Sequence, residues 1–205
     1  MLTERRLFIL RAIVALHFAS YRVCTDIVRA LITAGAGVDI ADISGRTPLI
    51  CASYFGHIDI VTALIAADAG VDIVDIRGDT PLYIASFQGH IDIVCALIAA
   101  GAGVNIADND GETPLYAACF NSDSAPRIIS DVIDIFDALI AAGADVNIAC
   151  VRGRTPLDVA IRYEREIITD VLIEAGATNG PNADDWSDDD EEEEDNTDDS
   201  EGQEW

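Results

Sequence analysis

A string of the form Gly-x-Thr-Pro-Leu occurs four times in this chain of 205 residues. The copies begin at Gly45, Gly78, Gly111 and Gly153, so their spacings are 33, 33 and 42 residues, the last being 33 plus nine. A fixed period of this length is typical of proteins built from stacked, near-identical units. One such unit cannot bury its apolar side alone, so the repeat predicts an elongated stack in which each unit packs against the next.

Each unit carries the signals of two short helices. The Thr-Pro step predicts the start of the first helix, because threonine can cap an unpaired amide and proline at the first helical position sacrifices no hydrogen bond. After a Gly-His pair, the segments 58–67 and 91–100 have apolar residues three and four apart, which predicts a second, amphipathic helix. Glycine follows the second helix in most units, where a left-handed residue is favourable, and Asp68 replaces it in one unit.

The segments between units, such as "VDIADISG" and "VNIADNDG", predict hairpin-like fingers. Asp42, Asp75 and Asp108 each precede a glycine by three positions, which matches the first and last residues of a type I turn.

The register of the repeat divides the chain into three parts. Stepping back 33 residues from Gly45 reaches residue 12, and the segment from Leu16 fits the pattern without a Thr-Pro step. We therefore expect a capping segment at 1–11, a repeat domain at 12–180 and a tail at 181–205. The five units are expected at 12–44, 45–77, 78–110, 111–152 and 153–178, and are numbered 1 to 5. Nine extra residues near 122–130 lie between the helices of unit 4, where a longer loop costs little entropy.

This combination of Gly, Thr-Pro-Leu, Gly-His and a terminal Gly-Ala step resembles the ankyrin repeat over residues 12 to 178. The resemblance implies an all-α, ankyrin-type helical-hairpin solenoid of about five repeats with β-hairpin-like loops. It also implies a hydrogen bond between units from the histidine after Thr-Pro-Leu. That histidine is present as His17, and the other units depart from the pattern with Ile50, Tyr83, Tyr116 and Asp158.

The charge is concentrated at the C-terminal end. The formal net charge is −25, and 14 of the 37 acidic residues lie between Asp184 and Glu204, with no basic residue among them. Such a run predicts a disordered acidic tail that modulates binding, contacts a basic protein or only improves solubility. A surface with this much negative charge repels phosphate and anionic lipid. We therefore expect no direct nucleic-acid or membrane partner.

Nothing in the sequence points to catalysis or to a cofactor. The five cysteines form no CxxC pair and no metal-ligand spacing, and the chain has no nucleophile–base set and no phosphate-binding GxxxxGK string. We therefore expect a noncatalytic protein without cofactor or metal site. Reduced thiols indicate a cytoplasmic or nuclear location, and Arg11 and His17 interrupt the apolar N-terminus before it reaches the length of a signal peptide or membrane span.

Aromatic side chains recur at the end of the first helix. The aromatic residues at this position or the next one are Tyr21, Tyr54, Phe55, Phe87, Phe120 and Tyr163. The ankyrin resemblance implies that these positions and the finger tips face the partner. Helices pack about 8–10 Å apart and rings stack at about 4.5–7 Å, so neighbouring rings are expected to leave gaps for a partner's side chains. The alternative is that the rings cover the edge of the core.

Arginines flank the turn glycines at Arg46, Arg77, Arg152 and Arg154, and can bind carboxylates or phosphates with two hydrogen bonds. Asp79, Asp110 and Glu112 make the middle of this row acidic. The alternative is a set of solvated turn charges that contribute little.

Three functions are compatible with these features. The first is a monomeric protein–protein interaction module that binds through the finger tips and first-helix aromatics. The second is a regulatory inhibitor that masks a basic segment of a nuclear protein, as the layout of repeats and acidic C-terminus is similar to inhibitors of Rel-type transcription factors. The third is a substrate adaptor or a pathogen or viral effector, since all twelve basic residues are arginine and lysine is absent.

Overall fold

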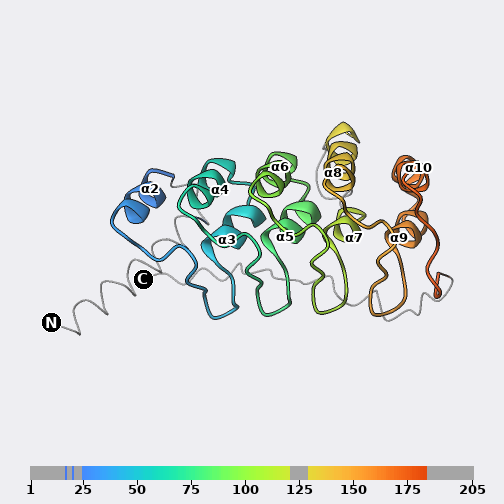
Figure 1. The fold of residues 1–205 in the computed structure, drawn as a ribbon, viewed down its shortest axis with the longest axis horizontal. Coiled ribbons are helices and arrows are strands. Elements are labelled where there is room, and N and C mark those ends of the chain that lie inside the picture. The colour runs from blue at the N-terminus through green and yellow to red at the C-terminus, as the bar shows by residue number, and fades with distance from the viewer. Residues whose placement is uncertain (1–16, 18–19, 21–24, 121–128, 184–205) are drawn as a thin grey trace, which may run out of the picture.

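The computed structural model describes residues 17, 20, 25–120 and 129–183. Within these residues every regular element is a helix, and the helices form pairs that stack side by side in a single row (Figure 1). The expected all-α solenoid is therefore confirmed for the described residues, with fingers made of turns and without strands. The expected capping segment 1–11, Tyr21, residues 121–128 of the insertion and the acidic tail from 184 onward lie outside the described residues.

The two helices of each unit occupy different layers. The layer beside the fingers contains the first helices α3 (Pro48–Tyr54), α5 (Pro81–Gln88), α7 (Pro114–Ala118) and α9 (Pro156–Arg162). The outer layer contains the second helices α2 (Thr25–Thr33), α4 (Ile58–Ile65), α6 (Ile91–Ala99), α8 (Ile129–Ala141) and α10 (Glu166–Glu174). All fingers project to the same side of the row (Figure 1). Among the described residues, no helix has the length and apolar character needed to cross a membrane.

The first helices begin where the Thr-Pro steps predict. The side-chain oxygens of Thr47, Thr80 and Thr113 accept hydrogen bonds of 3.3, 3.0 and 3.3 Å from the backbone N–H three residues later. In unit 5 the capping contact is an Asp158 carboxylate that accepts from the N–H of Thr155 at 2.8 Å. Each contact satisfies a helix-terminal group that would otherwise be unpaired, and is typically worth about 1 kcal/mol.

The second helices end in left-handed residues, as predicted. Gly101 has φ 88° and a Cβ added there would meet nothing within 4 Å, so its backbone conformation, not lack of space, favours glycine. Asp68 takes the same conformation in unit 2 with φ 59°.

The core runs without interruption between the units. The leucines of the Thr-Pro-Leu steps and the inward residues of α4, α6 and α8, such as Ile60, Ile93 and Phe136, are fully buried. They belong to one cluster that extends from Val28 in α2 to Leu172 in α10. Burial between neighbouring pairs therefore holds the stack together.

Part of the insertion in unit 4 lengthens a helix. Helices α4 and α6 begin at Ile58 and Ile91, and the equivalent residue of unit 4 is Ile133. Helix α8 begins at Ile129, so it starts four residues earlier than the repeat pattern requires. Residues 129 and 130 of the predicted loop are thus helical.

Candidate interaction surface

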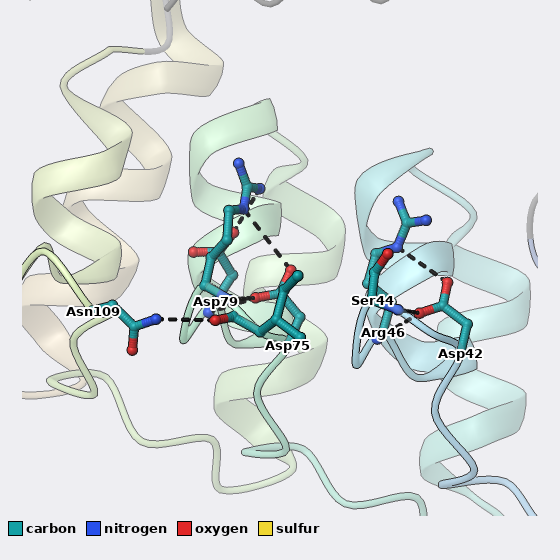
Figure 2. Close-up of polar contacts among 8 residues, drawn as sticks. Asp42, Ser44, Arg46, Asp75, Asp79 and Asn109 are labelled. Atoms are coloured by element: carbon teal, nitrogen blue, oxygen red, sulfur yellow. Dashed lines mark hydrogen bonds and ion pairs between the residues drawn. The ribbon is translucent and has the colours of Figure 1, made fainter.

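Each finger crosses the boundary between two units and is named here by the unit into which it leads. An aspartate organises the tip of the fingers of units 2, 3 and 4. Asp42 Oδ1 accepts from the N–H groups of Ser44 and Arg46 at 2.8 and 2.9 Å (Figure 2). Asp75 Oδ1 makes the same pair of contacts with Arg77 and Asp79 at 2.8 and 3.1 Å. The N–H of the glycine at the end of each turn donates to the carbonyl of the aspartate three residues earlier, at 3.0 Å for Gly45. The predicted turns are confirmed, and the carboxylate holds them closed.

Neighbouring tips are joined by hydrogen bonds. The N–H of Ile76 donates to the Ser44 carbonyl at 3.1 Å, that of Asn109 to the Arg77 carbonyl at 2.9 Å, and that of Val151 to the Asp110 carbonyl at 2.8 Å. Asn109 also donates through its side-chain amide to the Ile76 carbonyl at 3.0 Å (Figure 2). The finger tips therefore form one continuous row with a fixed spacing.

A second set of bonds joins the bases of the fingers, and it was not predicted from the sequence. The side-chain oxygens of Asp39, Asp72, Asn105 and Asn147 each accept from a backbone N–H of the following unit at 2.8–2.9 Å. Asn105 and Asn147 also donate to the carbonyls of Gly143 and Gly176, both at 3.2 Å. The recurrence of Asp or Asn at this position of successive units could have indicated these bonds.

The residues that replace the family histidine also reach the next unit in two cases. His17 Nε2 lies 2.9 Å from the Arg46 carbonyl oxygen, as the resemblance implies. The Tyr83 hydroxyl donates to Glu112 Oε2 at 3.1 Å, and the Tyr116 hydroxyl donates to Cys150 Sγ at 3.6 Å. Tyrosine thus replaces histidine without loss of a polar contact between units.

The arginines of the first two described fingers are exposed and paired with acids of their own finger. Arg46 Nε lies 3.2 Å from Asp42, and Arg77 lies 2.7 Å from Asp79 and 4.0 Å from Asp75. Partial burial works to raise the pKa of Asp42, but the N–H groups of Arg46 and Ser44 and the guanidinium outweigh it and lower that pKa. A partner's carboxylate would therefore compete with an existing ion pair.

The fingers of units 3 and 4 hold a buried carboxyl group, that of Asp79, and a half-buried one, that of Glu112. Burial raises the pKa of Asp79 to about 6, although the Arg77 guanidinium opposes the shift. Burial raises the pKa of Glu112 to about 7, and the neighbouring Asp108 adds to the shift. Proton uptake near neutral pH therefore reduces the negative charge in the middle of the row.

The expectation for Arg154 is wrong. Arg154 is only 5% exposed, and its positive charge partly opposes the burial that raises the pKa of Glu112. Arg154 thus belongs to the contact between units 4 and 5 and does not lie on the surface. Arg152, at the tip of the same finger, is exposed.

The first-helix aromatics divide into exposed and packed rings. Tyr54, Phe87 and Tyr163 are exposed, whereas Phe55 and Phe120 are half-buried. The centroid of the Phe120 ring lies 6.5 Å from that of Phe87 and 5.5 Å from that of Tyr163. The expected gaps between neighbouring rings are therefore absent here, because side chains on adjacent helices lean together and come closer than the helix axes. Tyr54 meets Phe55 edge-on at 4.9 Å.

The structure also shows an apolar feature that the sequence analysis missed. Ile43, Ile76 and Val151 stand at the same position of successive finger tips and are strongly exposed, and Asn109 holds this position in unit 4. We call these four residues the finger-tip row. The sequence signal was an aliphatic residue directly after the first residue of the turn, which is Asp42, Asp75 or Cys150, since turns usually carry polar side chains.

Three of the four cysteines within the described residues are buried. Cys51, Cys119 and Cys150 are buried, and Cys95 is exposed on α6. Burial raises the pKa of the Cys51 thiol to about 11, which disfavours the thiolate. In the part of the chain that the structure describes, no three His, Cys, Asp or Glu side chains are grouped to hold a metal ion.

Comparison with known protein families agrees with this geometry. A family model described as ankyrin repeats (3 copies) matches residues 12–76, 67–133 and 101–185. Repeats of this kind generally serve protein–protein interaction, and no catalytic domain was found. No curated protein matches the chain at a significant level. The matches together cover residues 12 to 185, and the chain therefore belongs to the ankyrin repeat family.

Proposed function

We propose that this protein is a noncatalytic interaction module that binds a protein partner along its finger tips and first-helix aromatics. The proposal rests on two sets of exposed apolar side chains, one at the finger tips and one at the ends of the first helices. The finger-tip row contributes Ile43, Ile76 and Val151, and the first-helix ends contribute Tyr54 and Phe87. Exposed aliphatic and aromatic side chains in a continuous arrangement mark interaction surfaces more often than scattered ones do.

The hydrogen bonds between fingers favour this surface for binding. Each tip is joined to its neighbour by a backbone bond of 2.8–3.1 Å, so the finger-tip row is already ordered before a partner arrives. A pre-ordered surface loses less conformational entropy on association, and large exposed aromatic side chains commonly supply most of the interface energy.

The sign of the charge alternates along the row of finger tips. The tips of units 3 and 5 carry the exposed Arg77 and Arg152, whereas unit 4 between them carries Asp110 and the half-buried Glu112. We propose that acidic groups of the partner lie beside Arg77 or Arg152 and that the acidic tail modulates the contact.

The test uses the intact protein as bait. Full-length protein and the double variant Tyr54→Ala/Phe87→Ala are immobilised, and the captured proteins are identified. The control Ile27→Ala/Ile167→Ala removes two exposed side chains from the outer helices α2 and α10. We expect a partner that the wild type and the control capture and the aromatic variant loses. Equal capture by all three proteins would contradict the proposed surface.

A second candidate function is a regulatory inhibitor that masks a basic segment of a nuclear protein. The formal net charge of −25 and the acidic residues from Asp184 onward favour it. A chain that ends at Ala183 distinguishes the two functions, because the inhibitor should lose affinity for a basic partner whereas the simple module should keep it.

A further inference from the structure

The segment that follows α10 contacts the finger of unit 5, and we call its residues 176–182 the strap. The N–H of Thr178 donates to Asn147 Oδ1 at 2.8 Å, and the N–H of Gly180 donates to Asp158 Oδ2 at 2.9 Å. These two bonds hold the strap at the base of the finger and at the first turn of α9.

The far end of the strap reaches the tip of the same finger. The side-chain amide of Asn182 donates to the Arg152 carbonyl at 2.8 Å. The carbonyls of Arg77 and Asp110 hold the same position in the two preceding fingers, and each accepts from the tip N–H of the next unit. The strap therefore supplies at unit 5 a hydrogen bond that a following finger supplies elsewhere.

Only glycine fits in the middle of the strap. A Cβ added to Gly180 would collide with the Gly153 carbonyl oxygen and would lie 2.8 Å from Asp158 Oδ2. The residue before it is Asn179, which is exposed and whose side chain makes no hydrogen bond with the other described residues. This pair is the one Asn-Gly step in the chain. The close approach that requires glycine at position 180 thus also creates a step that is open to chemical change.

An asparagine that precedes glycine can lose its side-chain amide to its own backbone. The Gly180 nitrogen, once hydroxide has taken its proton, forms a bond to Asn179 Cγ. The Cγ–Nδ2 bond breaks, and Nδ2 leaves as ammonia with a proton from water. Water then opens the resulting succinimide ring, which gives aspartate or, with an extra methylene in the backbone, isoaspartate. Glycine favours the reaction because no side chain obstructs its nitrogen.

The closed strap opposes the first step of this reaction. The Gly180 N–H donates to a carboxylate oxygen of Asp158, so loss of its proton would place two negative groups against each other. Asp158 is 3% exposed, and the same oxygen accepts from the N–H of Thr155 at 2.8 Å, which fixes its position. The reaction therefore requires the strap to open. Its rate in the folded chain equals the rate in an unfolded chain multiplied by the fraction of open straps.

We propose that Asn179–Gly180 is a deamidation site that the strap protects, and that conversion to isoaspartate keeps the strap open. The extra backbone methylene lies between the anchored N–H groups of Thr178 and Gly180, so the spacing of these donors no longer matches that of their acceptors. Conversion also adds a negative charge next to Gly180. The inference does not depend on the proposed partner-binding function, although an open strap would release the carbonyl of Arg152 at a finger tip.

The test follows conversion at Asn179 in the full-length protein. The protein is incubated at pH 8, folded or in guanidinium chloride, and peptide mass spectrometry detects the mass gain of an amide that becomes a carboxyl group. We expect conversion to be at least about tenfold slower in the folded chain, in proportion to the fraction of open straps. Asn105 and Asn147, each followed by isoleucine, are internal references that should stay intact in both samples.

Two variants separate the strap from the rest of the fold. Asn182→Ala removes the bond to the Arg152 carbonyl and should speed conversion in the folded chain by about threefold or more. Asn109→Ala is the matched control, because it removes the same kind of bond, to the Ile76 carbonyl, from the finger of unit 4 and should leave the rate unchanged. Circular dichroism checks that both variants are folded.

If Asn182→Ala lowers the helix content, Pro181→Gly, which adds backbone freedom to the strap, takes its place. Equal conversion rates in the folded and denatured chains would overturn the protection. A strap variant that converts no faster than the wild type would do the same, as would an equal acceleration by Asn109→Ala.

The effect of conversion on the strap is measured by hydrogen exchange. Protein that contains isoaspartate is isolated by anion exchange, and the exchange of its backbone amides is followed by mass spectrometry. We expect a peptide that covers the strap to exchange at least about threefold faster than in unconverted protein, while peptides from α4 stay unchanged. Unchanged exchange in the strap would show that isoaspartate fits the closed strap, and would overturn the second part of the proposal.

Discussion

The hydroxyl of Tyr83 donates a hydrogen bond of 3.1 Å to Glu112 Oε2, which joins residues 29 positions apart in neighbouring units. The tyrosine occupies the position of the family's histidine, and the glutamate belongs to the next finger. Burial and the nearby Asp108 raise the pKa of Glu112 to about 7, so this contact between units contains a group that titrates near neutral pH.

The first prediction concerns the pH dependence of stability. The pKa of Glu112 is about 7 in the folded chain against a model-peptide value of 4.5, so between these pH values the folded state holds a proton that the unfolded state has released. Stability should therefore fall as pH rises from 4.5 to 7, and Asp79 acts in the same direction up to its pKa of about 6. Glu112→Gln should raise the free energy of unfolding by about 1–3 kcal/mol at pH 8 and by much less at pH 4.5. Urea denaturation at both pH values measures this, and an equal effect at both would contradict it.

The second prediction separates the hydrogen bond from the burial of Glu112. Tyr83→Phe removes the hydroxyl and leaves the carboxyl group in its partly buried site. We expect a loss of about 1 kcal/mol in the free energy of unfolding, while stability still falls between pH 4.5 and 7. Loss of that pH dependence in Tyr83→Phe would show that burial is not its main cause.

The third prediction concerns the carboxylate that closes the finger of unit 3. Asp75 is buried and its Oδ1 accepts from the N–H groups of Arg77 and Asp79. Asp75→Ala leaves two N–H groups without this acceptor and should lower the free energy of unfolding by about 2–4 kcal/mol. Asp75→Asn keeps an acceptor oxygen and should cost clearly less. Chemical denaturation of both variants measures the difference, and equal losses would count against the finger contacts.

The periodic features of the fold were predictable from the sequence. Helix starts at Thr-Pro steps, left-handed ends such as Gly101 and turns such as Asp42–Gly45 each depend on a few adjacent residues, and their recurrence at 33 residues separates them from chance. The base-of-finger contacts of Asp39 and its counterparts were equally periodic and could have been found in the same way.

The errors concern side-chain directions between units. The sequence places Arg154 next to a turn glycine but does not show that this residue is buried, with its charge near enough to act on the pKa of Glu112. Similarly, the spacing of helix axes does not fix the distance between Phe87 and Phe120, because each ring can lean along the stack. Such details depend on how two units pack, which no single repeat encodes.

The fourth prediction concerns Asp68, which follows α4 at the position where the other described units have glycine. Asp68 has φ 59°, a conformation that glycine adopts without strain and that glycine provides in the other described units. Asp68→Gly should raise the free energy of unfolding by about 0.5–1 kcal/mol, and Gly101→Asp should lower it by a similar or larger amount. Thermal unfolding of both variants checks the signs. Destabilisation by Asp68→Gly would mean that the aspartate side chain contributes more than its backbone strain costs.

The last prediction separates rings that stabilise the stack from rings that are free to bind. Phe120 is half-buried and lies within 6.5 Å, centroid to centroid, of Phe87, Tyr116 and Tyr163, whereas Tyr54 is exposed. Phe120→Ala should therefore lower the free energy of unfolding by about 2–4 kcal/mol, because it removes packed area and ring contacts, and Tyr54→Ala should lower it by less than about 1 kcal/mol. Urea denaturation of the two variants, followed by circular dichroism, measures both values. If Tyr54→Ala destabilised the protein as much as Phe120→Ala, Tyr54 would act mainly in the core, and any loss of binding in the aromatic double variant would reflect unfolding.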